Sequence, residues 1–223
     1  MPSSSIEFLL NNELITINEA NTNTTVLEYL RNYKNLKGTK EGCASGDCGA
    51  CTAVIAEMKN NKLKYKSINT CITLLYSLHS KQLLTVEYIE SKYLHPVQQS
   101  MVDNDGAQCG FCTPGFIMSM YAMHKNKIKT TDSNINRYLS GNLCRCTGYR
   151  PIKESLKNLK KYKNLDSDTS KIFEKLVEVL LFGKSIFLSI DSSKQTIDSS
   201  KQSADSSKQS IGSSKQSADS SKQ

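Results

Sequence analysis

The chain has 223 residues, of which 38% are hydrophobic, and it carries a formal net charge of +8 and eight cysteines. It contains no run of about 18 uncharged apolar residues, and its first residues are not a basic segment followed by an apolar one, which argues against a membrane span and a secretory signal. We therefore expect a cytoplasmic protein, where reduced cysteines favour metal or cluster binding over disulfides.

The first part of the chain predicts a small sheet with one helix. Residues 6–17 read as two short strands around the Asn11-Asn12 turn. Residues 25–28 have a capping-box pattern, which opens a helix that we expect to end near Tyr33. Residues 52–58 and 63–68 predict a second hairpin, and residues 83–87 predict a final strand. Residues 1–90 are thus expected to form an α+β domain.

From Pro96 onward, the hydrophobic spacing becomes helical. The four predicted helices are residues 97–102, 115–124, 134–139 and 152–162. Asp132 or Ser133 is the expected N-cap of the third helix, and Gly141 is its expected terminating glycine. Residues 91–165 are therefore expected to form a small all-α domain.

The end of the chain is different in kind. Residues 166–190 predict a linker or one amphipathic helix. Within residues 191–223, the unit SSKQ recurs every seven residues. Each repeat holds one apolar residue, too few for the seam of a coiled coil, so we expect a disordered tail.

Much of the positive charge comes from lysines scattered along the chain. Five of them cluster late in the chain, with apolar residues at helical spacing between them: Lys153, Lys157, Lys160, Lys161 and Lys163. They indicate either a solvated helix face or a docking face for an acidic partner. Binding to nucleic acid is not expected, because no aromatic platform accompanies the charge.

The eight cysteines form two sets of four. The first set, with spacing C-x4-C-x2-C and one distant cysteine, is Cys43, Cys48, Cys51 and Cys71. This is the plant-type ferredoxin arrangement for a [2Fe–2S] cluster, and glycines between the ligands allow the backbone to wrap the cluster closely. Structural zinc is the alternative, but three cysteines on one glycine-rich loop fit zinc poorly.

The second set is less decisive by spacing alone. It consists of a C-x2-C and a later C-x-C, namely Cys109, Cys112, Cys144 and Cys146. This spacing fits zinc about as well as it fits an iron–sulfur cluster. The choice between the two therefore depends on the residues around the cysteines.

Four segments resemble the xanthine oxidase family of molybdenum hydroxylases. They are GTKEGCASGDCGACT (38–52), LHPVQQSMVD (94–103), QCGFCTPGFIMSM (108–120) and GNLCRCTGYRPI (141–152). The resemblance covers residues 6–163, in the family's order. The forms GDCGAC and LHPVQQSMV most resemble the small iron–sulfur subunit of bacterial xanthine dehydrogenases.

The resemblance implies an N-terminal β-grasp ferredoxin domain and a four-helix domain, each with one [2Fe–2S] cluster. It implies that the second cysteine set holds the cluster beside molybdopterin, and that the first set holds the cluster nearer the flavin. Gln108 matches a glutamine that contacts the pterin. Tyr149 is expected to pack against the cluster loop. Arg145 either offsets cluster charge or is simply exposed to solvent.

The same resemblance implies partner chains. A bacterial small subunit commonly continues into a flavin domain, whereas only Gly183 and Gly212 follow Lys163, so no glycine-rich dinucleotide loop is expected here. Either a partner carries FAD or the gene is a truncated remnant. The expected partners are a molybdopterin-binding large subunit and a FAD-binding subunit or domain.

The sequence therefore predicts the electron-transfer subunit of a xanthine dehydrogenase-like oxidoreductase, with no catalytic residue of its own. Electrons from purine hydroxylation at molybdenum would pass through both clusters to FAD and NAD. The alternatives are an iron–sulfur subunit of a carbon monoxide or aldehyde dehydrogenase complex, a free two-cluster carrier, and a zinc-binding interaction protein.

Overall fold

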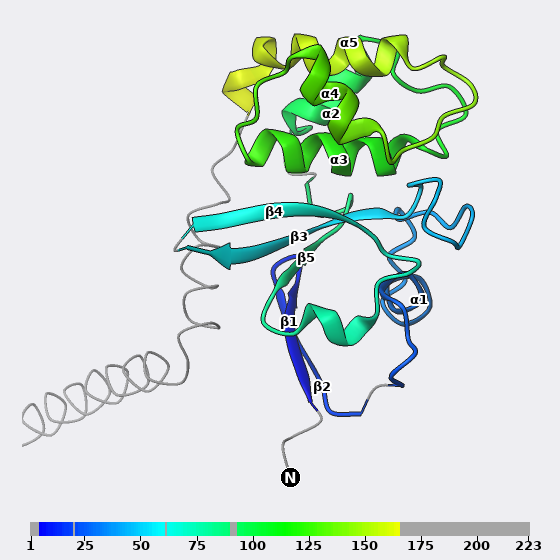
Figure 1. The fold of residues 1–223 in the computed structure, drawn as a ribbon, viewed down its shortest axis with the longest axis vertical. Coiled ribbons are helices and arrows are strands. Elements are labelled where there is room, and N and C mark those ends of the chain that lie inside the picture. The colour runs from blue at the N-terminus through cyan, green and yellow to red at the C-terminus, as the bar shows by residue number, and fades with distance from the viewer. Residues whose placement is uncertain (1–4, 20, 61, 90–92, 166–223) are drawn as a thin grey trace, which may run out of the picture. The chain divides into compact units, whose positions relative to one another are not determined.

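The computed structural model of the protein describes residues 5–19, 21–60, 62–89 and 93–165, which all lie in one compact unit of residues 1–177. The predicted linker (166–190) and repeat tail (191–223) lie outside the described residues. A mixed sheet is followed by helices, in agreement with the predicted α+β class (Figure 1). No helix in the described part of the chain is long and apolar enough to cross a membrane.

Five strands form one sheet in the order β2-β1-β5-β3-β4. They are β1 (Ile6–Leu10), β2 (Glu13–Ile17), β3 (Thr52–Lys59), β4 (Lys62–Asn69) and β5 (Gln82–Leu84). The hairpins β1–β2 and β3–β4 flank β5, which runs parallel to β1 and antiparallel to β3. Both hairpins were predicted, and Asn11 and Asn60 each adopt the left-handed conformation that asparagine tolerates.

The last strand is shorter than predicted, because β5 ends at Leu84 rather than at residue 87. The backbone N–H of Thr85 donates to Oδ1 of Asn11 at 3.0 Å, so a turn side chain takes the place of the next ladder bond. Strand β5 therefore ends beside the turn of the first hairpin.

One face of the sheet is covered by α1 (Val26–Glu28), by η1 (Tyr29–Tyr33) and by the short helix η2 (Leu75–Leu78). The predicted cap is confirmed, since the Thr25 hydroxyl accepts from the Glu28 N–H at 3.1 Å. The second half of the segment is a π-type turn and ends at the predicted residue. Its apolar side chains join one core with the sheet: Ile6, Phe8, Leu10, Ile15, Val26, Tyr29, Leu30, Ala53, Ile55, Leu75, Leu78 and Leu83.

The second half of the described chain contains α2 (Pro96–Asp103), α3 (Thr113–Lys125), α4 (Asp132–Leu139), α5 (Arg150–Asn158) and η3 (Leu159–Leu165). The first three predicted helices lie within α2, α3 and α4. The fourth, predicted over residues 152–162, is α-helical only to Asn158 and continues as a 3-10 helix in which Tyr162 is not helical. The helix α3 is buried along residues 115–123, and it contacts β3 and β4 as well as α2 and α4. A helix that is apolar around its whole circumference is expected to lie between two layers in this way.

The predicted start of α4 was wrong, whereas its end is where Gly141 predicted it, with Ser140 as C-cap, although the glycine does not have the expected conformation. The N-cap is Thr131, whose hydroxyl accepts from the Asn134 N–H at 3.3 Å, rather than Asp132 or Ser133. Gly141 does not adopt a left-handed conformation to end the helix. The Asn142 N–H instead donates to the Leu139 carbonyl at 3.0 Å, and this bond turns the chain toward the second cysteine set.

Candidate metal centres

The first cysteine set is assembled by a loop and a hairpin. Cys43, Cys48 and Cys51 lie on the loop between η1 and β3, and Cys71 follows β4. In the β3–β4 ladder Thr52 pairs with Asn69, so the residues just outside this pair are brought together. The Sγ atoms of Cys51 and Cys71 lie 3.4 Å apart.

The loop directs backbone N–H groups at sulfur. Sγ of Cys43 accepts from the N–H groups of Ser45, Asp47 and Cys48 at 3.3–3.5 Å. The N–H of Cys43 in turn donates to Sγ of Cys48 at 3.3 Å. Such converging donors favour the thiolate form, which is the form that binds iron.

The pKa values of this set diverge for identifiable reasons. Hydrogen bonds from Ser45, and then from Cys48, lower the pKa of the Cys43 thiol to about 6. Burial, followed by the neighbouring Cys51 thiol, raises the pKa of Cys71 to about 12. Two thiols in contact cannot both ionise easily unless a cation compensates their charge.

The second set lies at two helix ends. Cys109 and Cys112 are on the bend that leads into α3, and Cys144 and Cys146 are on the loop between α4 and α5. After burial, the neighbouring Cys144 thiol is the main influence that raises the pKa of Cys112, and the neighbouring Cys109 thiol raises the pKa of Cys146. The structure therefore places the four cysteines that the sequence grouped on two segments, as two neighbouring pairs.

The electrostatics of the second set follow the same pattern. Burial, followed by the bond with Cys144, raises the pKa of Cys112 to about 12. Burial acts to raise the pKa of Cys144, but hydrogen bonds from Thr147, Cys112 and Cys146 together outweigh it, so the pKa of this thiol is lowered. The Thr147 hydroxyl lies 3.2 Å from Sγ of Cys144.

The cysteines of each set are thus neighbours in pairs. Sulfur atoms are in contact in the pair Cys51–Cys71, and reciprocal N–H···S bonds join Cys43 and Cys48. In the second set, the pairs in which one thiol raises the pKa of the other are Cys112 with Cys144 and Cys109 with Cys146. Within the described residues, no group of three or more histidine, cysteine or acidic side chains gathers closely enough to hold a single metal ion. A [2Fe–2S] cluster takes four cysteines, divided between its two irons. Paired thiols with surrounding N–H donors fit that division.

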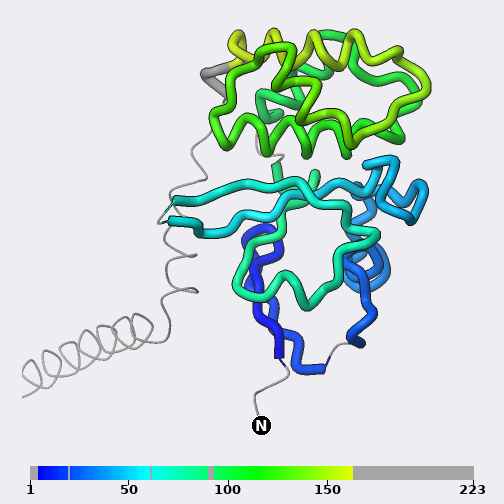
Figure 2. Tube along the Cα trace, in the orientation of Figure 1, coloured from blue at the N-terminus to red at the C-terminus, as the bar shows by residue number. Residues whose placement is uncertain are grey.

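The two sets lie close to each other in the fold. The loop of the first set, blue in Figure 2, approaches the yellow-green loop of the second set, and the Leu143 N–H donates to the Cys48 carbonyl at 2.9 Å. This bond joins a residue next to Cys144 to a cysteine of the first set.

Three further residues that the sequence singled out lie beside cysteines of the second set. Gln108 is exposed on the bend directly before Cys109, and Arg145 is exposed between Cys144 and Cys146. Tyr149 packs as expected: its hydroxyl accepts from the Cys144 N–H at 3.1 Å, and its ring lies edge-on to Phe116 at 6.4 Å.

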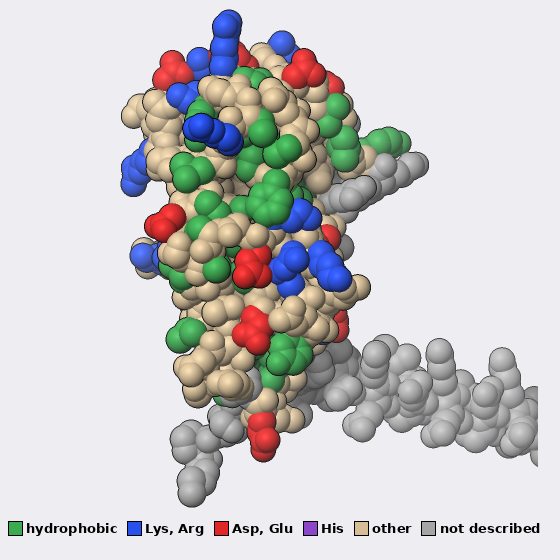
Figure 3. Space-filling view, turned by 90° about the vertical axis from the view of Figure 1, so that its right-hand side faces the viewer, with side chains coloured by type: hydrophobic (Ala, Val, Ile, Leu, Met, Phe, Trp, Pro, Cys, Tyr) green, Lys and Arg blue, Asp and Glu red, His purple; other side chains and the backbone are tan. Residues whose placement is uncertain are grey.

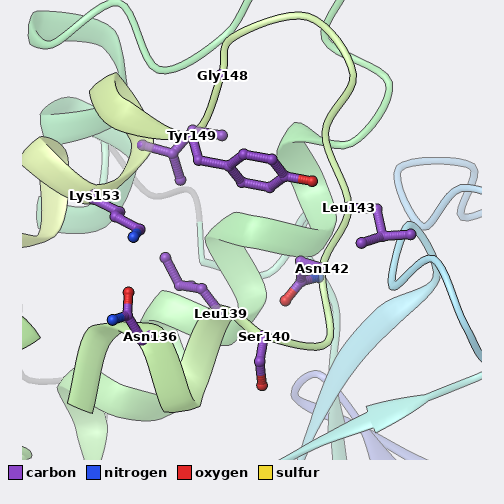
Figure 4. A pocket seen from close by; sticks show the side chains of 9 residues that line it. Asn136, Leu139, Ser140, Asn142, Leu143, Gly148, Tyr149 and Lys153 are labelled. Atoms are coloured by element: carbon purple, nitrogen blue, oxygen red, sulfur yellow. The ribbon is translucent and has the colours of Figure 1, made fainter. Parts of the chain in front are cut away.

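A cavity of about 390 Å³ borders the second set, between the end of α4 and the start of α5. Figure 4 shows Tyr149 and Lys153 on one side of it and Asn136 and Ser140 on the other. Its lining mixes amide, hydroxyl and apolar groups and contains none of the cysteines.

Sequence reasoning missed the role of Asn142, although the residue lies inside a quoted motif. Its amide is 4% exposed and bonds to groups that are about 90 residues away in the sequence. The one signal in the sequence that points to it is the position of this polar residue, shortly before Cys144 and Cys146.

Comparison with known proteins assigns a domain family to each of two regions of the chain. Residues 8–76 match the 2Fe-2S iron-sulfur cluster binding domain, and residues 85–157 match the [2Fe-2S] binding domain. The mouse protein xanthine dehydrogenase/oxidase is 45% identical over 157 residues, which are 69% of this chain. The chain spans only 12% of the length of that relative.

Two solved bacterial structures are similar in fold. Aldehyde oxidoreductase from Desulfovibrio gigas is 26% identical with a TM-score of 0.64, covering 78% of this chain and 18% of that one. Quinoline 2-oxidoreductase from Pseudomonas putida 86 is 26% identical with a TM-score of 0.60, covering 70% of this chain and 96% of the compared chain. With its two 2Fe-2S domains, the chain belongs to the xanthine dehydrogenase family and corresponds to the iron–sulfur region of its members.

Proposed function

We propose that each cysteine set holds one [2Fe–2S] cluster and that its two thiol pairs bind different irons. In the first cluster, Cys43 and Cys48 would bind one iron, and Cys51 and Cys71 the other. In the second cluster, the pairs are Cys109 with Cys146 and Cys112 with Cys144. The observation that carries this proposal is that the cysteines of each set are neighbours in pairs: through a sulfur contact or N–H···S bonds in the first set, and through a thiol that raises the pKa of its neighbour in the second.

When bound, the two clusters would relay single electrons from a molybdopterin centre to FAD and NAD during purine hydroxylation. The chain's own residues supply the thiolates, the N–H groups that stabilise charge on sulfur, and the packing that holds the two sites together. Gln108 would contact the pterin, since it is exposed beside Cys109 and its neutral amide can both donate and accept hydrogen bonds.

We also propose two domains within the compact unit, a β-grasp ferredoxin domain of residues 1–90 and a four-helix domain of residues 91–165. The matched regions 8–76 and 85–157 support a division between the sheet and the helices. The hydrogen bonds between the halves support domains that work as one body.

The partners proposed are a molybdopterin-binding large subunit and a FAD-binding subunit or domain. Large apolar side chains remain exposed around the cysteines, including Ile72 (57%), Phe111 (48%) and Leu143 (54%). Figure 3 shows the side of the molecule where the cysteine loops lie, with hydrophobic, basic and acidic side chains intermixed. Exposed apolar groups within a polar surround are typical of a docking surface.

The test is to isolate the complex that contains this chain and to add xanthine anaerobically. Bleaching of the cluster absorbance, together with molybdenum and FAD in the complex, is the expected result. Bleaching by aldehydes or carbon monoxide alone would instead favour the second candidate, a subunit of an aldehyde or carbon monoxide dehydrogenase, which the similarity to aldehyde oxidoreductase supports. A complex without molybdenum would contradict both.

A further inference from the structure

A buried asparagine lies between the two cysteine sets. Nδ2 of Asn142 donates to the Gly49 carbonyl at 3.0 Å and lies 3.1 Å from the Thr52 hydroxyl oxygen. Oδ1 of Asn142 accepts from the Ser119 hydroxyl at 2.6 Å. The amide is therefore hydrogen-bonded on both its nitrogen and its oxygen, and a buried polar group satisfied in this way has one preferred orientation.

The partners of this amide belong to both candidate cluster sites. Gly49 lies between Cys48 and Cys51, and Thr52 follows Cys51 directly. Ser119 is on α3, the helix that begins after Cys112, and Asn142 itself precedes Cys144 by two residues. One side chain thus connects the two loops that carry the cysteines.

The contact surface around Asn142 leaves no spare room. A Cβ atom added at Gly49 would overlap the Gly141 carbonyl oxygen, and one added at Gly115 would overlap the Gly49 carbonyl oxygen. Gly115 lies three residues after Cys112. The backbones of the two sites therefore touch directly, at the point where the asparagine bonds.

We propose that Asn142 is a positioning residue that fixes the separation and orientation of the two clusters. This inference rests on the proposed function, because it requires a cluster at each site. Removal of the amide leaves the Ser119 hydroxyl without its acceptor and the Gly49 carbonyl with bonds from Thr52 alone, within its own loop, and it opens a void where the two loops meet. The loops then lose their shared anchor while each keeps its four cysteines.

The test compares the full-length chain, anaerobically loaded with iron and sulfide, with its Asn142→Ala and Asn158→Ala variants. Asn158 is the matched control, since its amide bonds to Asn104 at 2.7 Å within the helical half. The readout is the low-temperature EPR spectrum of the fully reduced protein, in which two nearby paramagnetic clusters split each other's signals. Iron content is measured on every sample.

The expected result is that Asn142→Ala loses the resolved splitting while it keeps both signals and wild-type iron content, and that Asn158→Ala keeps the splitting. Unchanged splitting in Asn142→Ala overturns the inference. If that variant fails to hold iron, Ser119→Ala decides, because it removes only one bond of the amide: reduced splitting supports the inference and wild-type splitting refutes it. Wild-type protein without iron would instead refute the proposed function.

Discussion

Substitution of Gly49 by alanine tests the close contact between the two cysteine loops. Gly49 has φ +69°, and an added Cβ would meet the Gly141 carbonyl and Nδ2 of Asn142. Gly148 is the matched control, because it has nearly the same backbone conformation, φ +66°, with open space around its Cβ position. Both alanine variants lose about 1–2 kcal/mol from the left-handed backbone. Gly49→Ala should lose a further 1–3 kcal/mol, roughly, from steric overlap.

This difference is measurable by thermal unfolding of the cluster-loaded chain. For a protein of this size, 1 kcal/mol corresponds to roughly 2–4 °C in Tm, so Gly49→Ala should melt about 2–12 °C below Gly148→Ala. Loss of visible cluster absorbance and loss of far-ultraviolet circular dichroism are followed in the same scan. Equal melting temperatures for the two variants would refute the close packing of the loops.

Three further predictions concern single contacts. Tyr149→Phe removes the hydroxyl that accepts from the Cys144 N–H, so it should cost about 1 kcal/mol and shift the EPR signal of the second cluster but not that of the first. Thr25→Ala removes the cap of α1, so it should lower stability by about 1 kcal/mol in a denaturant titration without loss of iron. In the iron-free chain, alkylation of Cys43, followed by mass spectrometry, should slow as the pH falls through about 6 because the thiolate becomes protonated, whereas Cys71, with its raised pKa, should react slowly at neutral pH. Unshifted EPR signals, unchanged stability or equal alkylation rates would contradict these predictions in turn.

Local signals in the sequence were sufficient for most of the fold. Asparagine pairs between alternating segments located both hairpins, and Thr25 located the start of α1. The start of α4 was harder, because Thr130, Thr131, Asp132 and Ser133 are all polar candidates for one cap. The end of β5 depended on the side chain of Asn11, which is distant in the sequence.

The grouping of the cysteines into two sets was predictable from the sequence, but the contact between the two sets was not. The β3–β4 register brings Cys51 and Cys71 together, and a hairpin prediction already contains that register. Contact between the two sets includes Asn142, whose bonds to Gly49 and Thr52 span 93 and 90 residues. Periodicity and spacing describe neighbours along the chain and carry no information about such a pair.

Anaerobic reduction of the purified full-length chain, with EPR spectroscopy and counts of iron and acid-labile sulfide, tests the central claim most directly. Two clusters predict two distinct [2Fe–2S] signals and about four irons per chain. Cys48→Ser should remove one signal, and Cys109→Ser should remove the other. A single signal, or zinc with little iron, would contradict the assignment of one cluster to each cysteine set.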